Sequence, residues 1–250
     1  MMKKFIYTIM FAALSLAVSA QTDKVAADSA YVKGDYKAAI EIYESLAANN
    51  GESADVYYNL GNAYYKSENI AKAVLNYERA LLLNPDDEDI RFNLELARSK
   101  TVDKVAPEYK FFLMEWLEGI INLLSISAWS VLAVVSFVVM LLTLLLFLFG
   151  KSVSTKKTGF IIALFSLFIT IFANLSALHR YHYLTERNDA VIMEPSVTAK
   201  STPSNSGTEL FVIHEGRKVK ISDDSMREWT EIELEDGNKG WIPSSSLERI

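Results

Sequence analysis

The sequence contains no cysteine and only three histidines. The absence of cysteine excludes a disulfide framework, a cysteine-ligated zinc site, an iron–sulfur cluster and a thiol nucleophile. Three histidines leave few ligands for other metal chemistry, so we expect no cofactor. The sequence also has no phosphate-cradling glycine loop and no Gly-x-Ser-x-Gly elbow. We therefore predict that the protein is not an enzyme.

Charge and apolar residues are unevenly distributed along the 250 residues. The net charge of −6 argues against nucleic acid as a partner, because phosphate neutralisation dominates such binding. Residues 21–100 carry 9 basic and 14 acidic side chains, and residues 184–250 carry 8 and 13. Residues 101–183 carry 6 basic and 4 acidic side chains and hold long apolar runs. Two acidic, soluble-looking blocks thus flank an apolar middle.

The N-terminal segment has the pattern of a secretory signal. Two lysines precede Phe5–Val18, an apolar run that is shorter than the roughly 20 residues of a membrane span. Ser19 and Ala20 supply small residues where signal peptidase cuts. We predict a signal peptide over residues 1–20, and the alternative is an uncleaved signal anchor. In both cases the chain that follows is exported.

Two apolar runs in the middle predict transmembrane helices, over residues 128–149 and 158–178. Neither run contains a charge or a polar face, and each meets the requirement of roughly 20 residues for crossing a bilayer. The loop over residues 150–157 has three lysines and no acid, so the positive-inside rule places it in the cytoplasm. Both soluble blocks then lie on the other side. This agrees with the export signal and predicts that both soluble domains lie on the exported side of the membrane.

The linker over residues 102–127 contains a predicted amphipathic helix. Phe112, Trp116 and Ile120 recur at every fourth position, and charged side chains lie between them. We expect this helix, over Tyr109–Asn122, to lie on the outer leaflet of the membrane. The alternatives are an extension of the first span or a contact with the soluble block.

A regular repeat fills the first soluble block. Ala39 is followed by Ala73, and Tyr43 by Tyr77, at the same spacing. This period of about 34 residues is typical of stacked helix–turn–helix units. Residues 54–87 resemble a tetratricopeptide repeat (TPR), and the matching positions are Tyr57, Leu60, Gly61, Tyr64, Ala73, Tyr77, Ala80 and Pro85. Residues 21–53 resemble a degenerate first repeat, and residues 88–101 a capping helix.

In repeats of this kind the first helices line a groove that holds a peptide. The resemblance implies groove positions at Tyr58, Asn59, Asn62, Tyr65, Lys66, Phe92 and Asn93, with Leu96 beside them. Alternatively, Tyr58 and Phe92 pack against each other and Asn59 satisfies a neighbouring turn. Because each unit contacts only its neighbours, two repeats and a cap form a short solenoid. We expect it to be marginal alone, or steadied by a partner or by the membrane.

Residues 179–250 are predicted to form the C-terminal domain, in which the pattern changes from helical to alternating at Asp189. Trp229–Leu234 alternates like a half-buried strand, Asp236-Gly237 predicts a hairpin turn, and residues 239–242 follow as the next strand. This order of strands and turns resembles the small β-barrel of bacterial SH3 domains. We expect Trp229 and Trp241 to lie either in its core or on a ligand face.

The whole chain is thus predicted to be a multidomain membrane protein: an α-helical TPR solenoid, a two-helix transmembrane hairpin and a C-terminal SH3-like β-barrel. This order resembles the Bacteroides aerotolerance BatE family. The resemblance implies an interaction scaffold of the bacterial inner membrane, with periplasmic soluble domains, in an oxygen- and stress-tolerance system. Its partners would be membrane proteins with von Willebrand A domains, other Bat proteins and a MoxR-type ATPase complex. The alternative is a cell-wall sensor that binds peptidoglycan through the SH3-like domain.

Overall fold

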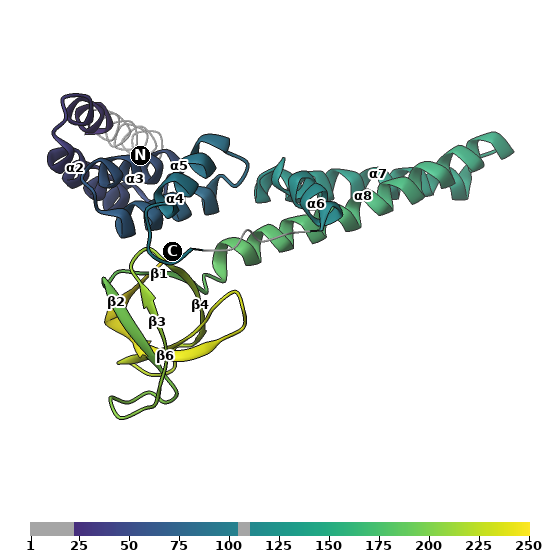
Figure 1. Ribbon diagram of the computed structural model, residues 1–250. Helices are drawn as coiled ribbons and strands as arrows, with labels where there is room; N and C mark the ends of the chain where they lie inside the picture. The colour runs from purple at the N-terminus through teal and green to yellow at the C-terminus, as the bar shows by residue number, and fades with distance from the viewer. Residues whose placement is uncertain (1–22, 105–110) are drawn as a thin grey trace, which may run out of the picture. The chain divides into compact units, whose positions relative to one another are not determined.

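The structure, a computed structural model, describes residues 23–104 and 111–250 (Figure 1). The chain divides into two compact units. The first joins two distant stretches, residues 1–106 and 188–250, and the second is Pro107–Arg187. The predicted signal peptide over residues 1–20 lies outside the described residues. The start of the predicted amphipathic helix, at positions 109 and 110, lies outside them as well.

The repeat region of the first unit is a series of helices joined by short turns. They are residues 23–32, α2 (Tyr36–Asn50), α3 (Ala54–Lys66), α4 (Ile70–Leu83) and α5 (Glu88–Arg98). The side chains of Asp35, Asn69 and Asp87 cap α2, α4 and α5 by accepting hydrogen bonds from backbone N–H groups of the first turn. Helix α4 ends at Leu83, just before Pro85, which cannot continue a helix.

Consecutive repeat helices pack against each other around tyrosine and small residues. Tyr43 and Tyr77 are almost completely buried. A Cβ atom built on Gly61 would lie 2.7 Å from the Tyr77 ring. The α3–α4 crossing therefore requires glycine at this position, which is one of the positions that match the repeat.

The C-terminal region is a seven-stranded antiparallel sheet with strand order β3-β2-β6-β5-β4-β1-β7. The strands are β1 (Asp189–Ile192), β2 (Ser196–Lys200), β3 (Glu209–His214), β4 (Lys218–Asp223), β5 (Trp229–Glu233), β6 (Lys239–Pro243) and β7 (Leu247–Arg249). The strands predicted near Trp229 and Trp241 are confirmed as β5 and β6. The end strands β3 and β7 do not pair with each other, so the sheet is not closed by hydrogen bonds.

Strand β1 connects the sheet to the repeat helices because it is buried on both faces. Ala190 and Ile192 belong to the core of the sheet. Val191, between them, packs into the core of the repeat helices together with the C-terminal Ile250. Repeat helices and sheet are therefore one folded unit, although the entire second unit lies between them in the sequence.

The second unit contains α6 (Phe112–Asn122), α7 (Ile126–Phe149) and α8 (Val153–Thr185). Helix α8 extends beyond residues 158–178 at both ends, so α7 and α8 are joined by residues 150–152 alone. Both helices are long and apolar enough to cross a membrane. Only 17% of the most apolar stretch of α7 and 22% of that of α8 is buried within the protein, whereas a core helix of a soluble protein would be mostly buried.

Helices α7 and α8 pack through small residues. A Cβ atom on Gly159 would lie 2.8 Å from the Thr143 carbonyl oxygen, so the two backbones nearly touch there. The hydroxyl groups of Ser136 and Thr170 are 2.8 Å apart and form a hydrogen bond between the helices. Close backbone approach and a few internal hydrogen bonds are how helices associate where no water is present to drive apolar burial.

Candidate functional site

Three of the predicted groove residues form one hydrogen-bonded group with Tyr77, which we name the Tyr–Asn cluster: Tyr58, Asn62, Tyr77 and Asn93. The Asn93 amide donates to the Tyr58 hydroxyl over 2.8 Å and to Asn62 Oδ1 over 3.2 Å. The Tyr77 hydroxyl donates to the same Asn62 Oδ1 over 2.7 Å. These bonds connect α3, α4 and α5, so the cluster fixes the helices relative to one another.

The protonation of Tyr77 suits this role. Burial raises the pKa of the Tyr77 phenol, and the neighbouring phenols of Tyr58, Tyr31 and Tyr65 raise it further. The Tyr77 hydroxyl therefore keeps its proton at neutral pH and remains a donor to Asn62.

The remaining predicted groove residues differ in their surroundings. Phe92 is 66% exposed and Leu96 is 40% exposed, and they lie one turn apart on α5. The Tyr65 ring packs beneath Lys100, whose Nζ is 4.2 Å from the ring centroid. Asn59 is half-buried and Lys66 is exposed, and within residues 23–104 and 111–250 no hydrogen bond joins either to the Tyr–Asn cluster. Phe92 and Leu96 thus form the accessible apolar edge of the predicted site.

A buried carboxylate on α4, absent from the sequence prediction, joins the repeats to the sheet. The Glu78 side chain is 5% exposed and pairs with Arg98 on α5 and with Lys218 on β4, where the Oε2–Nζ distance is 3.2 Å. Lys218 also pairs with Asp189 at 2.9 Å. Burial alone would lower the pKa of Lys218, but the charges of Glu78 and Asp189 raise it above its ordinary value. Lys218 is therefore charged at neutral pH.

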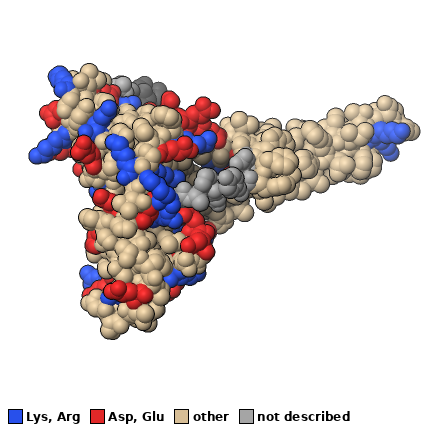
Figure 2. Space-filling view, viewed as in Figure 1, with Lys and Arg blue, Asp and Glu red and all other residues tan. Residues whose placement is uncertain are grey.

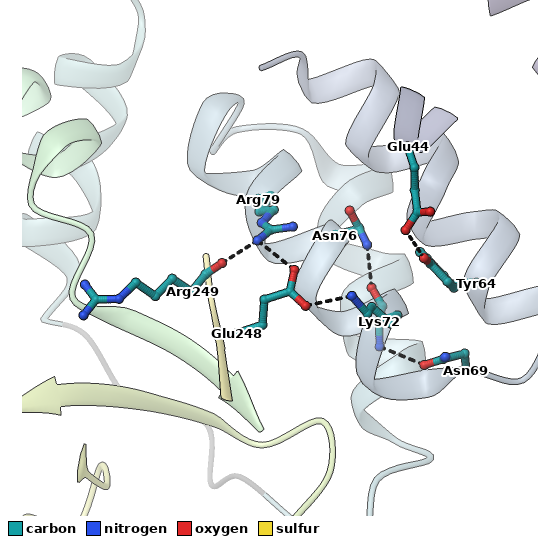
Figure 3. Close-up of polar contacts among 8 residues, drawn as sticks. All are labelled: Glu44, Tyr64, Asn69, Lys72, Asn76, Arg79, Glu248 and Arg249. Carbon is teal, nitrogen blue, oxygen red and sulfur yellow. Dashed lines mark hydrogen bonds and ion pairs between the residues drawn. The ribbon is translucent and has the colours of Figure 1, made fainter. Parts of the chain in front are cut away.

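A second ion-pair group joins α4 to β7 (Figure 3). Glu248 lies 2.7 Å from Lys72 Nζ and 3.2 Å from Arg79 Nη2. Arg79 also donates to the Arg249 carbonyl over 2.6 Å. Burial opposes ionisation of Glu248, but the bonds and charges of Lys72 and Arg79 prevail and lower its pKa. This group therefore holds the last strand to the repeat at neutral pH.

The segment after α5 makes a third contact with the sheet. Asp103 accepts a hydrogen bond from the His214 backbone N–H over 2.8 Å, and its other oxygen is 2.9 Å from His214 Nδ1. Gly216, at φ +78°, leaves room for Thr101, since a Cβ atom on Gly216 would lie 2.6 Å from Thr101 Cγ2. The chain is thus anchored to the sheet immediately before it continues toward the hairpin.

A cleft of about 390 Å³ opens where the α3–α4 turn meets the sheet. Its lining is mostly polar and consists of Ser67, Glu68, Asn69, Ala71, Lys72, Met193 and Glu215. Lys72 is already paired with Glu248. The cleft therefore presents acidic and amide groups from the α3–α4 turn and from the sheet.

The two tryptophans of the sheet lie on the face turned away from its core. Along β5 and β6 the buried positions alternate with half-buried ones, and Trp229 and Trp241 are both half-buried. The core of the sheet instead holds Ile232 and Ile242. Trp229 pairs with Pro243, and Trp241 pairs with Glu231. Both indoles therefore lie on one face of adjacent strands, where a ligand has access to them.

Comparison with known families agrees with the helical geometry. Residues 54–87, which contain α3 and α4, match the family model of the tetratricopeptide repeat. No curated protein matches the chain. Residues 54–87 are thus a tetratricopeptide repeat, a module that typically binds other proteins in non-enzymatic scaffolds, and this implies protein partners.

Proposed function

We propose that the chain is an adaptor of the bacterial inner membrane. In this proposal the α7–α8 hairpin spans the membrane, and the repeats with an SH3-like sheet form one protein-binding module in the periplasm. The resemblance to the BatE family supports a role in an aerotolerance system. It also supports von Willebrand A domain membrane proteins and a MoxR-type ATPase complex as partners.

The observation that carries the proposal is the ion pairing between the repeats and the sheet. Glu78 with Lys218, and Lys72 with Glu248, join chain segments on either side of the hairpin. Such contacts form only when both segments are in the same compartment. A chain that crosses the membrane twice returns to the side on which it started, so the paired module and the hairpin are mutually consistent.

The charge of the hairpin supports a cytoplasmic position for the α7–α8 connection. Lys151, Lys156 and Lys157 are exposed at this end, and Figure 2 shows the visible surface of the long helices otherwise bare of basic and acidic side chains. The predicted topology puts this basic end in the cytoplasm.

The protein-binding face is tested at the apolar edge on α5. Tyr58 and Asn62 are unsuitable positions, because changing them breaks the Tyr–Asn cluster. Phe92→Asp alters an exposed side chain, and Met226→Asp, in the loop between β4 and β5, is the matched control at 46% exposure. Affinity purification from solubilised membranes with mass spectrometry should show at least about a tenfold loss of partner for F92D alone, as for a central apolar contact. Equal recovery by both variants contradicts the proposal.

A second candidate function is binding of the cell wall through the sheet. The placement of Trp229 and Trp241 on one accessible face favours it, since sugar rings stack on aromatic side chains. Retention of the full chain on purified sacculi, lost in Trp241→Ala, would support this function. No retention of the unaltered protein removes it.

A further inference from the structure

Arg180, in the second unit, is a buried cation. It lies just past the charge-free run of α8 and is 8% exposed. Its Nη1 donates to Asn122 Oδ1 at the end of α6 over 2.9 Å, and its buried Nε has no hydrogen-bond partner among the described residues. In the part of the chain that the structure describes, no carboxylate forms an ion pair with it.

A second unpartnered polar atom lies on the same face of α8. Ser176 lies one helical turn before Arg180, and its buried Oγ has no hydrogen-bond partner within residues 23–104 and 111–250. Burying an unpaired charge is unfavourable, and a neutral amide supplies a hydrogen bond but no compensating charge. Among the described residues, the polar group around Arg180 therefore lacks an anion.

The position of Arg180 along the proposed membrane span limits the chemical identity of the anion that could pair with it. At 1.5 Å per residue, Arg180 lies about 3 Å beyond the end of the charge-free run, which is the level of lipid headgroups. Exposed aromatic residues mark the same level: Tyr181 is 53% exposed and Tyr183 is 48% exposed. Phosphate is the anionic group that every phospholipid presents there, and guanidinium is well matched to it.

Helix α6, which ends at Asn122, adds an apolar surface that begins at its opposite end. The Trp129 indole donates to the Ile121 carbonyl over 2.8 Å and so holds the end of α6, including Asn122, against α7. The other end of α6 leaves Phe112, Leu113 and Met114 exposed. Acyl chains cover such a surface, whereas a free phosphate ion gains nothing from it.

We propose that Arg180 and Asn122 bind the phosphate of a bilayer phospholipid, whose acyl chains lie along the apolar surface of α6. This inference rests on the proposed membrane insertion of the hairpin. It assigns α6 and the outer end of α8 a lipid-binding role, in addition to anchoring.

Native mass spectrometry of the full chain in neutral detergent tests the proposal. Phosphatidylglycerol, phosphatidylethanolamine and diacylglycerol with identical acyl chains are titrated separately. Both phospholipids should bind at least about tenfold more tightly than diacylglycerol, because only they carry a phosphate for a charge-assisted hydrogen bond. Arg180→Gln should abolish this preference. Lys151→Gln, which removes an exposed charge at the other end of the hairpin, should retain it.

Three results overturn the proposal: equal binding of diacylglycerol and phospholipid, a preference that persists in R180Q, or displacement of the lipid by inorganic phosphate. If R180Q fails to fold, Asn122→Leu keeps the charge and should reduce the preference about threefold, since one orienting hydrogen bond is lost; an unchanged preference overturns the proposal equally. Extraction of the same variants from membranes with alkaline carbonate tests insertion separately. Release of the unaltered protein contradicts membrane insertion itself, whereas retention with no lipid preference contradicts only the lipid site.

Discussion

The contacts inside the first unit differ in kind from the contacts inside the second unit. The first unit combines an apolar core with buried or half-buried ion pairs, such as Glu78 with Arg98 and Lys218. The second is held by glycine, alanine and hydroxyl side chains between α7 and α8. In water, apolar burial favours folding and charges are tolerated at the margins of the core. Between lipid-facing helices burial gives little, so close backbone packing takes its place.

The two units also differ in the sequence separation of the residues that make their contacts. The contacts of α7 with α8 follow from two helices joined by a short connection. The contacts of the repeats with the sheet join residues that are distant in sequence, as Asp103 and His214 show. We therefore expect the stability of the first unit to depend on a few particular side chains. The contact between α7 and α8 should depend on the small size of the side chains between them.

Removing Glu78 should have the largest effect on the first unit. Glu78→Gln leaves Arg98 and Lys218 without their shared carboxylate. Loss of a buried partner costs about 3–5 kcal/mol, and partial exposure of both cations reduces this to roughly 2–4 kcal/mol of the free energy of unfolding. Urea unfolding followed by tryptophan fluorescence measures the change, and Glu95→Gln, on the exposed side of α5, is the control. A loss below about 0.5 kcal/mol in E78Q would mean that the ion pairs do not hold the unit together.

Enlarging Gly159 should affect the hairpin by a similar or slightly smaller amount. Gly159→Leu forces the backbones of α7 and α8 apart and should cost about 1–3 kcal/mol. The chain lacks cysteine, so the pair Ser136→Cys and Thr170→Cys reports the helix contact through disulfide formation. Crosslinking should fall sharply in G159L but not in Gly119→Leu, where a Cβ atom meets nothing within 4 Å. Unchanged crosslinking in G159L would contradict close backbone packing.

Gly216→Ala should weaken the contact between the repeats and the sheet. Its φ of +78° strains any side chain, and the new methyl group collides with Thr101. Gly237 is the control, because it has φ +84° and nothing near its Cβ position. A side chain there meets only the backbone strain, which is about 1 kcal/mol. We expect thermal unfolding to show a loss of about 2–3 kcal/mol for G216A and about 1 kcal/mol for Gly237→Ala. Equal losses would show that Thr101 contributes nothing.

Glu68→Gly should stabilise the second repeat by about 1 kcal/mol. Glu68 has φ +65°, a conformation that costs a non-glycine residue roughly this amount. The equivalent turn of the first repeat has Gly34 at φ +81°. A rise in the melting temperature of E68G checks this, with Glu52→Gly, in the connection before α3, as the control. A lower melting temperature would mean that Glu68 makes a compensating contact.

Acid should weaken the α4–β7 contact by about as much as the smallest of the other changes. Because the pKa of Glu248 is lowered in the folded protein, its contribution is complete above the ordinary glutamate pKa of about 4.3. The contribution is lost as the pH falls from there through the lower folded value, and solvent screening limits it to about 1 kcal/mol. Between pH 6 and about 3, urea unfolding should show a smaller loss of the free energy of unfolding in Glu248→Gln than in the unaltered protein. An identical pH profile in both proteins would exclude this role.

The local parts of the fold could be predicted, and the long-range contacts could not. Gly61 and Pro85 were among the residues that predicted the second repeat, and the alternating pattern after Trp229 predicted β5 and β6. No local period relates Glu78 to Lys218, since the hairpin separates them in sequence. One signal was available: Ala190–Met193 is uninterrupted apolar sequence rather than alternating, which is typical of a strand buried on both faces.

The candidate site shows the same division. The repeat spacing assigns Tyr58, Asn62 and Asn93 to one groove, but it does not specify the side-chain packing behind their hydrogen bonds. The bond of Asn62 to Tyr77 and the bond of Asn93 to Tyr58 both depend on that packing. Arg180 reads in the sequence as a residue flanking a span. Its burial follows from the packing of α6 beside it, and the periodic pattern that predicts this helix does not specify where the helix packs.

Cysteine labelling of intact spheroplasts tests most directly whether both soluble segments face the periplasm. Single cysteines are introduced at the exposed residues Glu95, Met226 and Ser154, in a chain that has no other cysteine. A membrane-impermeant maleimide should label the first two in intact spheroplasts and the third only after lysis. Labelling of Glu95→Cys and Met226→Cys from opposite sides of the membrane would contradict the account, because repeats and sheet would then never meet.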